Sequence, residues 1–509
     1  MKNLVLSIII LSTTTLLGQG SNSIQGKVID ETTQQPIIGA NVIVEDVNRG
    51  SATDVEGDFY IQSMPVGTYR LRVDYIGYTS RIISDVVVKS NRPAVINIEL
   101  QETILELEAA VVVAEYFTKS PDTPTSTQVQ SSEEIRRLPG GFEDVVRAIS
   151  ILPGVAQADG GRNDLIVRGG APSENLYIID NIEVPNINHF GTQGASGGPQ
   201  SYVNLDFVDE TSFSTGGFTA KYGDRLSSVL DISLREGLSD QLASKTTISA
   251  SQFGFNLEGA LPKNGNFLFS ARRSYLDFLF KAAGFGFVPE YWDFLTKATF
   301  DLNQTDQITF LGIAALNNVK WFNDTEKQRN SNSQILGSDQ QQIVVGINYR
   351  HLMNSGIFTT SLSQVNVEYD FLQRNADLTP IFSNSSYDRQ TSLKSDLTWK
   401  LSKSLRFSTG GKLNRVDFYS DLVLNQNDVP GVGSLNIEEE YAKVGYKSGA
   451  YAQLSQRFFR FNYTAGLRAD HSTFLDAAPV LSPRFSMNYK LTGDISVSTS
   501  VGRYNQFPS

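Results

Sequence analysis

Apolar and polar side chains alternate along much of the chain from about Gln241 to its last residue. One stretch shows the pattern clearly, because Phe461, Tyr463, Ala465, Leu467 and Ala469 are separated by Asn462, Thr464, Gly466, Arg468 and Asp470. The same period of two recurs in residues 393–401, 485–491 and 495–501. Successive side chains of a β-strand point to opposite faces, so each strand presents one apolar and one polar face. The chain is therefore expected to be mainly β.

Connections of two lengths separate the expected strands. Tight turns are expected at residues 263–266, 303–306, 354–356, 402–404 and 492–494, and long polar loops at 318–339, 374–388 and 421–445. A soluble sandwich would also alternate its side chains. Short turns at one end of the strands and long loops at the other are instead typical of a membrane-spanning barrel with an apolar outer face and a polar lumen. The pattern predicts about thirteen strands before Ser509.

The N-terminus has the form of a secretory signal peptide. Lys2 precedes the apolar run Leu4–Leu11, and Gly18-Gln19-Gly20 offers a small-x-small cleavage site, so cleavage is expected after Gly20. A membrane helix fits less well, because a span needs roughly 20 apolar residues. If the mature protein enters a membrane, it is expected to do so as strands closed into a barrel, since lipid leaves no water to satisfy open sheet edges.

Residues 21–103 show short alternating strands with Gly or Pro turns at regular spacing, which predicts a small Ig-like β-sandwich. This segment resembles the carboxypeptidase-regulatory-like domain, an accessory module that is found in front of many outer-membrane receptors. The namesake module accompanies a zinc carboxypeptidase but is not its catalytic part. A structural or partner-binding role is therefore expected here.

Two short apolar runs, Leu165–Val167 and Leu176–Ile179, flank a Gly-Gly-Ala-Pro turn that carries Arg168 at its edge. Runs rich in β-branched residues and bounded by Gly, Pro, Asn and Asp predict short buried strands, here paired with each other. Upstream, Ser131–Ile135 has the Ser caps and acidic residues of a helix start, and Asp144–Ile151 is expected to form a second helix. The segment is thus expected to be a small α/β domain.

This α/β segment resembles the plug domain of TonB-dependent outer-membrane receptors. The family pattern is an Ile/Val-x-Val-Arg-Gly strand, followed by an apolar strand that ends in Asp and leads to a Pro. A later Gly-x-x-x-Ala-x-Tyr-Gly segment also fits, although Ser227-Ser228 stands where a Gly pair is usual. The residues that match the family motifs are Arg168, Gly169, Asp180, Pro185, Gly216, Tyr222 and Gly223.

The resemblance divides the mainly β chain into a signal peptide (1–20), a carboxypeptidase-regulatory-like sandwich (21–103), a TonB box with linker (104–127), a plug (128–237) and a partial outer-membrane β-barrel (238–509). Plugged transporters of this class have about 22 strands. The last segment is therefore expected to be the first part of a large antiparallel transmembrane barrel. An incomplete barrel leaves an open edge that lipid does not tolerate, so the sequence is expected to be truncated.

The short run Ala110, Val111, Val112, Val113 and Ala114 stands at the position of the family's TonB box. A β-prone run next to the Pro/Thr/Ser-rich stretch 120–127 is suited to adding a strand to another protein's sheet edge. The same run could also be the last strand of the sandwich or the first strand of the plug. The signal peptide and the plug motifs favour the TonB box.

The resemblance implies TonB-dependent active import of a ligand, such as a siderophore, a glycan or cobalamin, across the outer membrane of a Gram-negative bacterium. The N-terminal domain and the plug then lie on the periplasmic side. The expected partners are TonB with its inner-membrane energy-transducing proteins, outer-membrane lipid and an unknown imported ligand. A surface ligand-binding lipoprotein is a further candidate, although Glu115-Tyr116-Phe117 replaces the Tyr-Gly that follows the box in the starch-utilisation branch. A non-transporting adhesion or structural protein of the outer membrane is the alternative.

Two site predictions concern the plug. Arg168 is expected to pair with carboxylates inside the barrel, in a structural or switching role. Residues 186–200 are rich in Gly, Asn and Ser and are expected to form an exposed loop. Asn188, His189 and Phe190 in this loop are candidate ligand contacts, by comparison with apex loops of the family. Packing beneath the outer loops is the alternative for these three residues.

Composition and spacing argue against other classes of function. The chain has no Cys, its three His residues are far apart, and no metal ligand set or nucleotide motif is present, so no metal and no cofactor are expected. A net charge of −11 disfavours nucleic acid as a partner. Carboxylate groups such as Asp180 with Glu183, residues 206–210 and residues 438–440 lack any supporting catalytic motif. No catalytic residue is therefore predicted, and the chain is not expected to be an enzyme.

Overall fold

A computed structural model describes residues 22–47, 49–90, 92–103, 126–141, 143–158, 161–194, 197–249, 252–275, 280–281, 283–429, 433–492 and 495–508. The expected signal peptide, residues 1–20, and the expected TonB box, Ala110–Ala114, lie outside these residues. The chain divides into two compact units, Met1–Ser120 and Pro121–Ser509.

The first unit contains two small sheets. One contains β1 (Ile24–Asp30), β4 (Asp58–Ile61), β7 (Ala94–Val95) and β8 (Ile98–Leu100), and the other joins β3 (Arg49–Ala52), β2 (Asn41–Val44), β5 (Gly67–Asp74) and β6 (Arg81–Val88). Alternate residues of these strands, such as Val42, Leu71 and Val73, are fully buried in one shared hydrophobic core. This arrangement confirms the predicted β-sandwich.

The second unit begins with a small domain that we call the plug, residues 126–235. Its main sheet has five strands, in the order β13 (Ile182–Val184), β12 (Asn175–Ile179), β15 (Ser228–Leu234), β14 (Val208–Ser214) and β9 (Thr127–Ser131). Strand β12 is buried along its whole length. Strand β9, the first strand of the domain in the sequence, forms one edge of this sheet.

Two short helices of the plug begin where the sequence predicted them. Helix α2 (Ser132–Arg137) starts with a capping box, in which the Ser131 hydroxyl accepts from the Glu134 N–H and the Glu134 carboxylate accepts from the Ser131 N–H. Helix α3 (Val145–Ser150) starts with the Asp144 carboxylate, which accepts from the Val146 N–H at 2.8 Å. Two 3-10 turns, η1 (Pro172–Glu174) and η2 (Leu205–Phe207), complete the helical part.

The predicted pairing of Leu165–Val167 with Leu176–Ile179 is wrong. Strand β11 (Leu165–Val167) pairs with β10 (Val155–Gln157), whereas β12 pairs with β13 and β15. The connection is no hairpin, because Arg168 (φ 51°) and Gly169 (φ 81°) turn the chain away after β11 and η1 follows. A side-chain hydrogen bond from Asn175 Nδ2 to the Leu165 carbonyl, 2.8 Å long, still ties β12 to β11.

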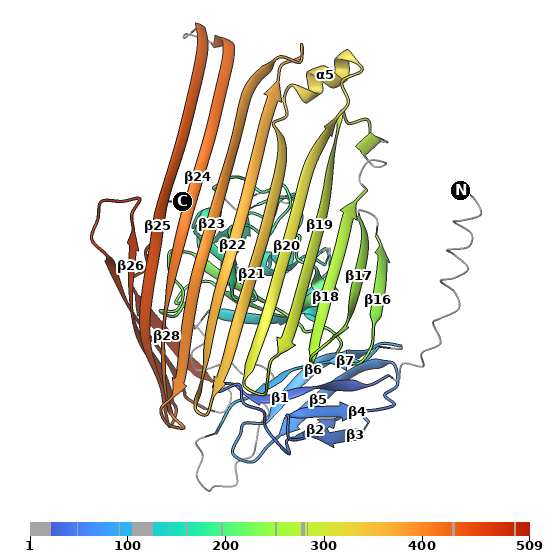
Figure 1. The fold of residues 1–509 in the computed structure, drawn as a ribbon, viewed down its shortest axis with the longest axis vertical. Coiled ribbons are helices and arrows are strands. Elements are labelled where there is room, and N and C mark those ends of the chain that lie inside the picture. The colour runs from blue at the N-terminus through green and yellow to red at the C-terminus, as the bar shows by residue number, and fades with distance from the viewer. Residues whose placement is uncertain are drawn as a thin grey trace, which may run out of the picture. The chain divides into compact units, whose positions relative to one another are not determined.

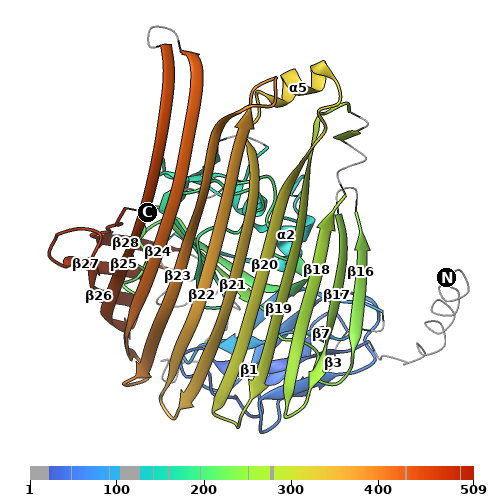
Figure 2. The ribbon, with the colours of Figure 1, turned by 45° about the horizontal axis from the view of Figure 1, so that its top comes forward.

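In the rest of the second unit, the described residues form one antiparallel sheet of thirteen strands, which we call the wall, and this number confirms the predicted count. Its strands follow the sequence order: β16 (Ala243–Ile248), β17 (Gln252–Leu261), β18 (Gly265–Ser274), β19 (Phe287–Asp301), β20 (Asp306–Trp321), β21 (Gly337–Met353), β22 (Gly356–Arg374), β23 (Pro380–Lys400), β24 (Leu405–Val429), β25 (Gly433–Phe458), β26 (Phe461–Ser472), β27 (Val480–Lys490) and β28 (Ser496–Gly502). The wall strands lie side by side at a common tilt and curve around the plug (Figures 1 and 2).

The connections of the wall agree only partly with the sequence prediction. Four of the five tight turns lie where they were expected, for example Asn354-Ser355 between β21 and β22, and the fifth, 492–494, falls partly outside the described residues. The first long connection contains helix α5 (Glu326–Asn332). The other two predicted loops are mostly strand, because β22 pairs with β23 up to Arg374 and β24 with β25 up to Val429. The backbone groups of these polar residues form hydrogen bonds between the paired strands. Low hydrophobicity was therefore not a sign of a loop at these positions.

Strands β24 and β25 are far longer than a bilayer requires. They contain 25 and 26 residues, whereas about 9–11 residues suffice to cross the hydrocarbon core. Outward-facing residues of the wall, such as Leu362, Leu393 and Leu413, are about half exposed. These apolar side chains fit a surface that meets lipid. Among the described residues, no helix is long and apolar enough to cross a membrane.

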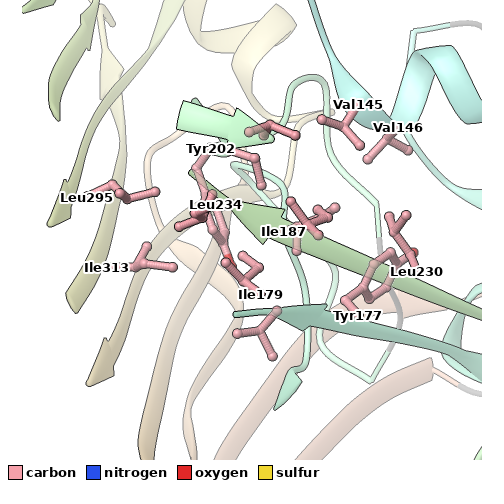
Figure 3. Close-up of a cluster of buried hydrophobic side chains, with 14 of the residues drawn as sticks. Val145, Val146, Tyr177, Ile179, Ile187, Tyr202, Leu230, Leu234, Leu295 and Ile313 are labelled. Atoms are coloured by element: carbon pink, nitrogen blue, oxygen red, sulfur yellow. The ribbon is translucent and has the colours of Figure 1, made fainter. Parts of the chain in front are cut away.

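One hydrophobic core joins the plug to the wall. The plug contributes Ile179, Ile187, Tyr202 and Leu234, and the wall contributes Leu295 and Ile313 of β19 and β20. Figure 3 shows these side chains gathered between the plug sheet and the wall strands. All of them are at most 5% exposed. Burial of apolar surface is therefore a main source of the affinity between plug and wall.

Leu230→Ala is expected to destabilise the plug by about 2–5 kcal/mol, because Leu230 is 0% exposed and its truncation leaves a cavity. Leu226→Ala is the matched control, since Leu226 is 43% exposed. Chemical denaturation of the purified protein, followed through a fluorophore on the plug, measures both effects. Equal midpoints for the two variants would contradict the burial assigned to Leu230.

Candidate functional site

The interface between plug and wall is the candidate functional site, because any passage through the lumen must change it. Plug carboxylates meet wall lysines there, in pairs that leave both charges compensated. The pairs are Asp180–Lys297 at 2.8 Å, Glu183–Lys412 at 2.7 Å, Asp206–Lys245 at 2.7 Å and Asp224–Lys447 at 3.2 Å. These lysines come from four different strands, β19, β24, β16 and β25, so the pairs distribute the attachment over much of the wall.

The motif residue Asp180 lies in the two-residue turn between β12 and β13. Asp180 (φ 45°) and Asn181 (φ 67°) both adopt the left-handed conformation that such hairpin turns require and that Asp and Asn tolerate. One carboxylate oxygen of Asp180 accepts from the Leu234 N–H at 2.7 Å, and the other faces Lys297. Asn181 Oδ1 accepts from Lys394 at 2.7 Å. The turn is therefore held by both the plug and the wall.

The pKa of Glu183 lies well below that of an ordinary glutamate. Burial by itself would raise the pKa of Glu183, but the nearby ammonium groups of Lys412 and Lys394 outweigh burial and hold the pKa at about 2. The carboxylate is therefore charged at every physiological pH. In Asp206, burial is likewise outweighed by Lys245 and Arg136, which lower its pKa.

A second set of contacts holds the loop Gly216–Asp224, which contains three of the predicted motif residues. Arg484 of β27 donates from Nη1 to the carbonyls of Phe218 (3.2 Å) and Tyr222 (2.6 Å). Arg468 of β26 donates to the Lys221 carbonyl at 3.1 Å and pairs with Asp470 at 2.7 Å. Two wall arginines thus grip the backbone of one plug loop.

Local contacts and backbone conformation explain why glycine occupies positions 216 and 223 and why tyrosine occupies position 222. A Cβ on Gly223 would lie 1.9 Å from Nε of Arg468, so glycine leaves room for the guanidinium in its present position. Gly216 has φ 127°, which other residues rarely adopt. The Tyr222 hydroxyl lies 3.2 Å from Asp231, and burial followed by the Asp231 charge raises its pKa. Tyr222 therefore stays neutral and donates to Asp231.

The prediction that Arg168 pairs with carboxylates inside the barrel is wrong for the part of the chain that the structure describes. Arg168 is exposed, and its Nη2 donates to the Thr215 hydroxyl at 3.2 Å, with no carboxylate within ion-pair distance among the described residues. The left-handed φ of Arg168 directs the chain out of β11 and places the side chain beside Gly216. Arg168 therefore braces the start of the Gly216–Asp224 loop.

The prediction that residues 186–200 form an exposed loop is also wrong for the first part of this range, because Asn186–His189 are buried. His189 is 0% exposed, lies 2.7 Å from Asn317 Oδ1 and 3.1 Å from Asp293 Oδ2, and stacks on Tyr291 at 4.0 Å. Asn188 is 1% exposed and bonds to Asn163 and Asn186. Asn188 and His189 thus pack into the wall, and only Phe190 is partly exposed. Polar side chains that satisfy one another allow this burial.

Sequence reasoning missed the wall residues that hold the plug. Lys297, Lys412, Lys447, Arg468 and Arg484 all stand in the polar half of the strand alternation, where Arg468 and Asp470 were already visible. A long cation on a lumen-facing position was the available signal. No group of three or more His, Asp or Glu suited to a metal ion occurs among the described residues.

Comparisons with known proteins agree with this architecture. Three family models match in sequence order: the CarboxypepD_reg-like domain at residues 24–112, the TonB-dependent Receptor Plug Domain at 119–228 and the Outer membrane protein beta-barrel family at 336–500. The chain is 26% identical over 228 residues to the TonB-dependent transporter Oar of Myxococcus xanthus, which is 43% of this chain and 20% of Oar. It is 25% identical over 227 residues to the TonB-dependent receptor SusC of Bacteroides thetaiotaomicron, which is 43% of this chain and 21% of SusC.

Solved structures show the same fold. The ferric enterobactin receptor PfeA of Pseudomonas aeruginosa aligns with a TM-score of 0.56 and 16% identity over 76% of this chain and 63% of PfeA. The outer-membrane transporter YddB of Escherichia coli aligns with a TM-score of 0.58 and 13% identity over 77% of this chain and 63% of YddB. The chain thus aligns with less than two thirds of each of these proteins.

A strand-built wall that surrounds a small α/β plug defines an outer-membrane β-barrel protein of the plugged class. Within this class, the chain belongs to the TonB-dependent receptors of the Gram-negative outer membrane and carries an N-terminal carboxypeptidase-regulatory-like domain.

Glu183→Gln is expected to remove a pH dependence of the plug's stability. Because the folded pKa of Glu183 is depressed, its contribution is present above about pH 4.5 and is lost as the pH falls towards 2. The contribution is at most about 3 kcal/mol. The temperature at which the plug unfolds should therefore fall more steeply between pH 6 and pH 2 in the wild type than in Glu183→Gln. Parallel curves would show that the Lys412 contact does not stabilise the folded plug.

Proposed function

We propose that this protein imports a ligand across the outer membrane, with energy from TonB and its inner-membrane partners. The sandwich and the plug then lie on the periplasmic side, where TonB reaches them. The ligand is a siderophore, a glycan, cobalamin or a similar molecule. The family membership and the names of the relatives support this proposal.

The position of β9 is the observation that carries the proposal. This strand directly follows the linker and forms the edge of the plug sheet, paired with β14 from Thr127–Ser214 to Ser131–Glu210. Ser126 just before it donates to the Gly216 carbonyl at 2.6 Å, and the hydroxyls of Thr127 and Ser214 lie 2.6 Å apart. A pull on the linker therefore acts first on the Thr127–Ser214 pair, and through it on β14 and the Gly216–Asp224 loop.

We further propose Ala110–Ala114 as the segment that TonB binds, by strand addition to an edge of the TonB sheet. The box and the first plug strand are separated by about a dozen residues that include the Pro/Thr/Ser-rich stretch. A chain of this length and composition is extended enough to reach a periplasmic partner. The competing interpretation is that Val111–Val113 belongs to a folded strand, and the sandwich family model does extend to residue 112.

We propose no catalytic role and no cofactor for this chain. Energy that arrives through TonB needs no nucleotide site in the receptor itself. Among the carboxylates considered as catalytic candidates, Asp180, Glu183 and Asp206 pair with wall lysines, and Glu438–Glu440 lie exposed on β25. Phe190, partly exposed at the plug apex, is the proposed ligand contact that remains of the three predicted ones.

A peptide of residues Leu107–Phe117 is expected to bind the TonB periplasmic domain of the same cell with saturable heat in calorimetry. Val112→Pro should weaken this binding at least about fivefold, because proline removes one ladder donor and the lost hydrogen bond is worth about 1 kcal/mol. Val112→Thr is the control, since threonine keeps the N–H, the shape and the strand preference.

Absence of binding by the wild-type peptide would contradict the TonB-box assignment. The Val-rich run would then belong to a folded strand. The non-transporting adhesion protein would become the better account of the chain.

A further inference from the structure

The plug meets the wall through two different surfaces. The first, which we call the apolar seam, is formed by strands β18–β22. These strands contribute nine buried residues to the hydrophobic core that they share with the plug: Leu268, Leu295, Leu311, Ile313, Ala315, Val344, Val365, Val367 and Tyr369. The plug places Ile182 of β13 there, whose Cδ1 lies 2.0 Å from where a Cβ on Gly346 would be. The apolar seam is therefore closely packed.

The second surface, which we call the polar seam, lies between the loop Gly216–Asp224 and strands β25–β27. The buried side chains of these strands are polar, apart from Tyr451, whose hydroxyl donates to Asp396 at 2.7 Å. They are Gln453, Ser455, Thr464, Arg468, Asp470, Ser472, Ser482 and Arg484. Among the described residues, none of β25–β27 belongs to the core that plug and wall share.

Strands β25–β27 hold the loop through its backbone. Its Phe218 belongs to a small apolar cluster of the plug, against which Tyr504 packs after β28. Arg468 and Arg484 donate to carbonyls of residues 218–222, and Asp224 pairs with Lys447. The Arg484 guanidinium lies over the Phe218 and Tyr504 rings, and its buried Nε and Nη2 have no hydrogen-bond partner among the described residues. Water or the polar groups of a ligand can replace such contacts.

The two seams stand at different distances from the point where a pull arrives. Strand β9 is one edge of the plug sheet, and β13 is the other. The end of β14 that pairs with Thr127 leads directly into the Gly216–Asp224 loop, through Ser214, Thr215 and Gly216. The polar seam is therefore adjacent to the pulled edge, whereas Ile182 of β13 anchors the opposite edge in the apolar seam.

We propose that the ligand path opens at the polar seam, between the loop Gly216–Asp224 and strands β25–β27, while the apolar seam stays closed and acts as the anchor. This inference rests on the proposed import function and specifies where in the described wall the plug yields. Opening the apolar seam would expose nine wall side chains to water, which the hydrophobic effect opposes. Opening the polar seam exchanges hydrogen bonds to protein for hydrogen bonds to water, at a small net cost for each bond. The resulting path is lined with polar groups and suits a hydrophilic ligand.

Two engineered disulfides test this proposal, and residues 1–509 contribute no competing thiol. Ala220→Cys with Gly466→Cys closes the polar seam, because a Cβ on Gly466 would lie 2.7 Å from the Ala220 Cβ. A disulfide needs about 3.5–4.5 Å between the two Cβ atoms, so the loop must shift by about 1 Å. Ile182→Cys with Gly346→Cys closes the apolar seam, because the Gly346 Cβ would lie 3.1 Å from Cγ1 of Ile182, one bond from its Cβ. The two pairs thus form matched controls.

The full-length receptor is placed in a planar lipid bilayer, a handle on its N-terminal domain is pulled in an optical trap, and the KCl current is recorded. Force should open a current in the receptor without a disulfide. The oxidised polar-seam pair should reduce this current at least tenfold relative to its reduced form, and the oxidised apolar-seam pair should change it by less than twofold. The reverse order, suppression by both disulfides or suppression by neither would overturn the proposal. A receptor without disulfides that never conducts under force would contradict the proposed plug remodelling itself.

A pair of single substitutions keeps the test independent of disulfide formation. Arg484→Gln removes the guanidinium that grips residues 218–222 and should lower the force at which the current appears. Val365→Ala, in the apolar seam, should leave that force unchanged, because this seam does not open. A lower opening force in Val365→Ala together with an unchanged force in Arg484→Gln would place the path at the apolar seam.

Discussion

Each wall strand has two faces, and the rest of the structure depends on what each face meets. Outward residues such as Leu362 and Leu413 are about half exposed, as lipid-facing side chains are, whereas inward residues such as Val365 and Arg468 are buried. One alternation therefore meets the membrane and receives the plug at the same time. A register shift by one residue would exchange the faces and move Arg468 from the plug loop into lipid. Every plug–wall contact thus requires the same register.

The plug is held at several points, and the kinds of contact differ. Near Ile182 and Leu234 the attachment is burial of apolar surface, which resists water over its whole area. Near the Gly216–Asp224 loop it consists of hydrogen bonds and ion pairs with Arg468, Arg484 and Lys447, which water can replace one at a time. A domain that must stay in the lumen and still yield on demand needs both kinds of contact.

The sequence alone predicted what depends on local pattern. The period of two predicted the thirteen wall strands, and the patterns at Ser131–Ile135 and Asp144–Ile151 predicted the two plug helices. The wrong predictions concern features that depend on contacts between residues far apart in the sequence. The partner of β11 depends on the left-handed Arg168, the length of β24 depends on its ladder with β25, and the burial of His189 depends on Asp293 and Asn317 of the wall. None of these contacts leaves a trace in local hydrophobicity. The lumen-facing lysines and arginines were visible as polar residues, but their plug partners were not.

The central claim is that TonB acts on the plug through β9 while the wall stays in place. The most direct measurement is pulsed hydrogen exchange in living cells with and without TonB, followed by quenching, purification of the receptor and peptide analysis. The account predicts that amides of β9 and of Ser214–Asp224 exchange faster in cells with TonB, whereas amides of β19–β22 exchange equally in both strains. Equal exchange of the β9 amides in the two strains would contradict the account, provided that the strain with TonB takes up the ligand under the same conditions.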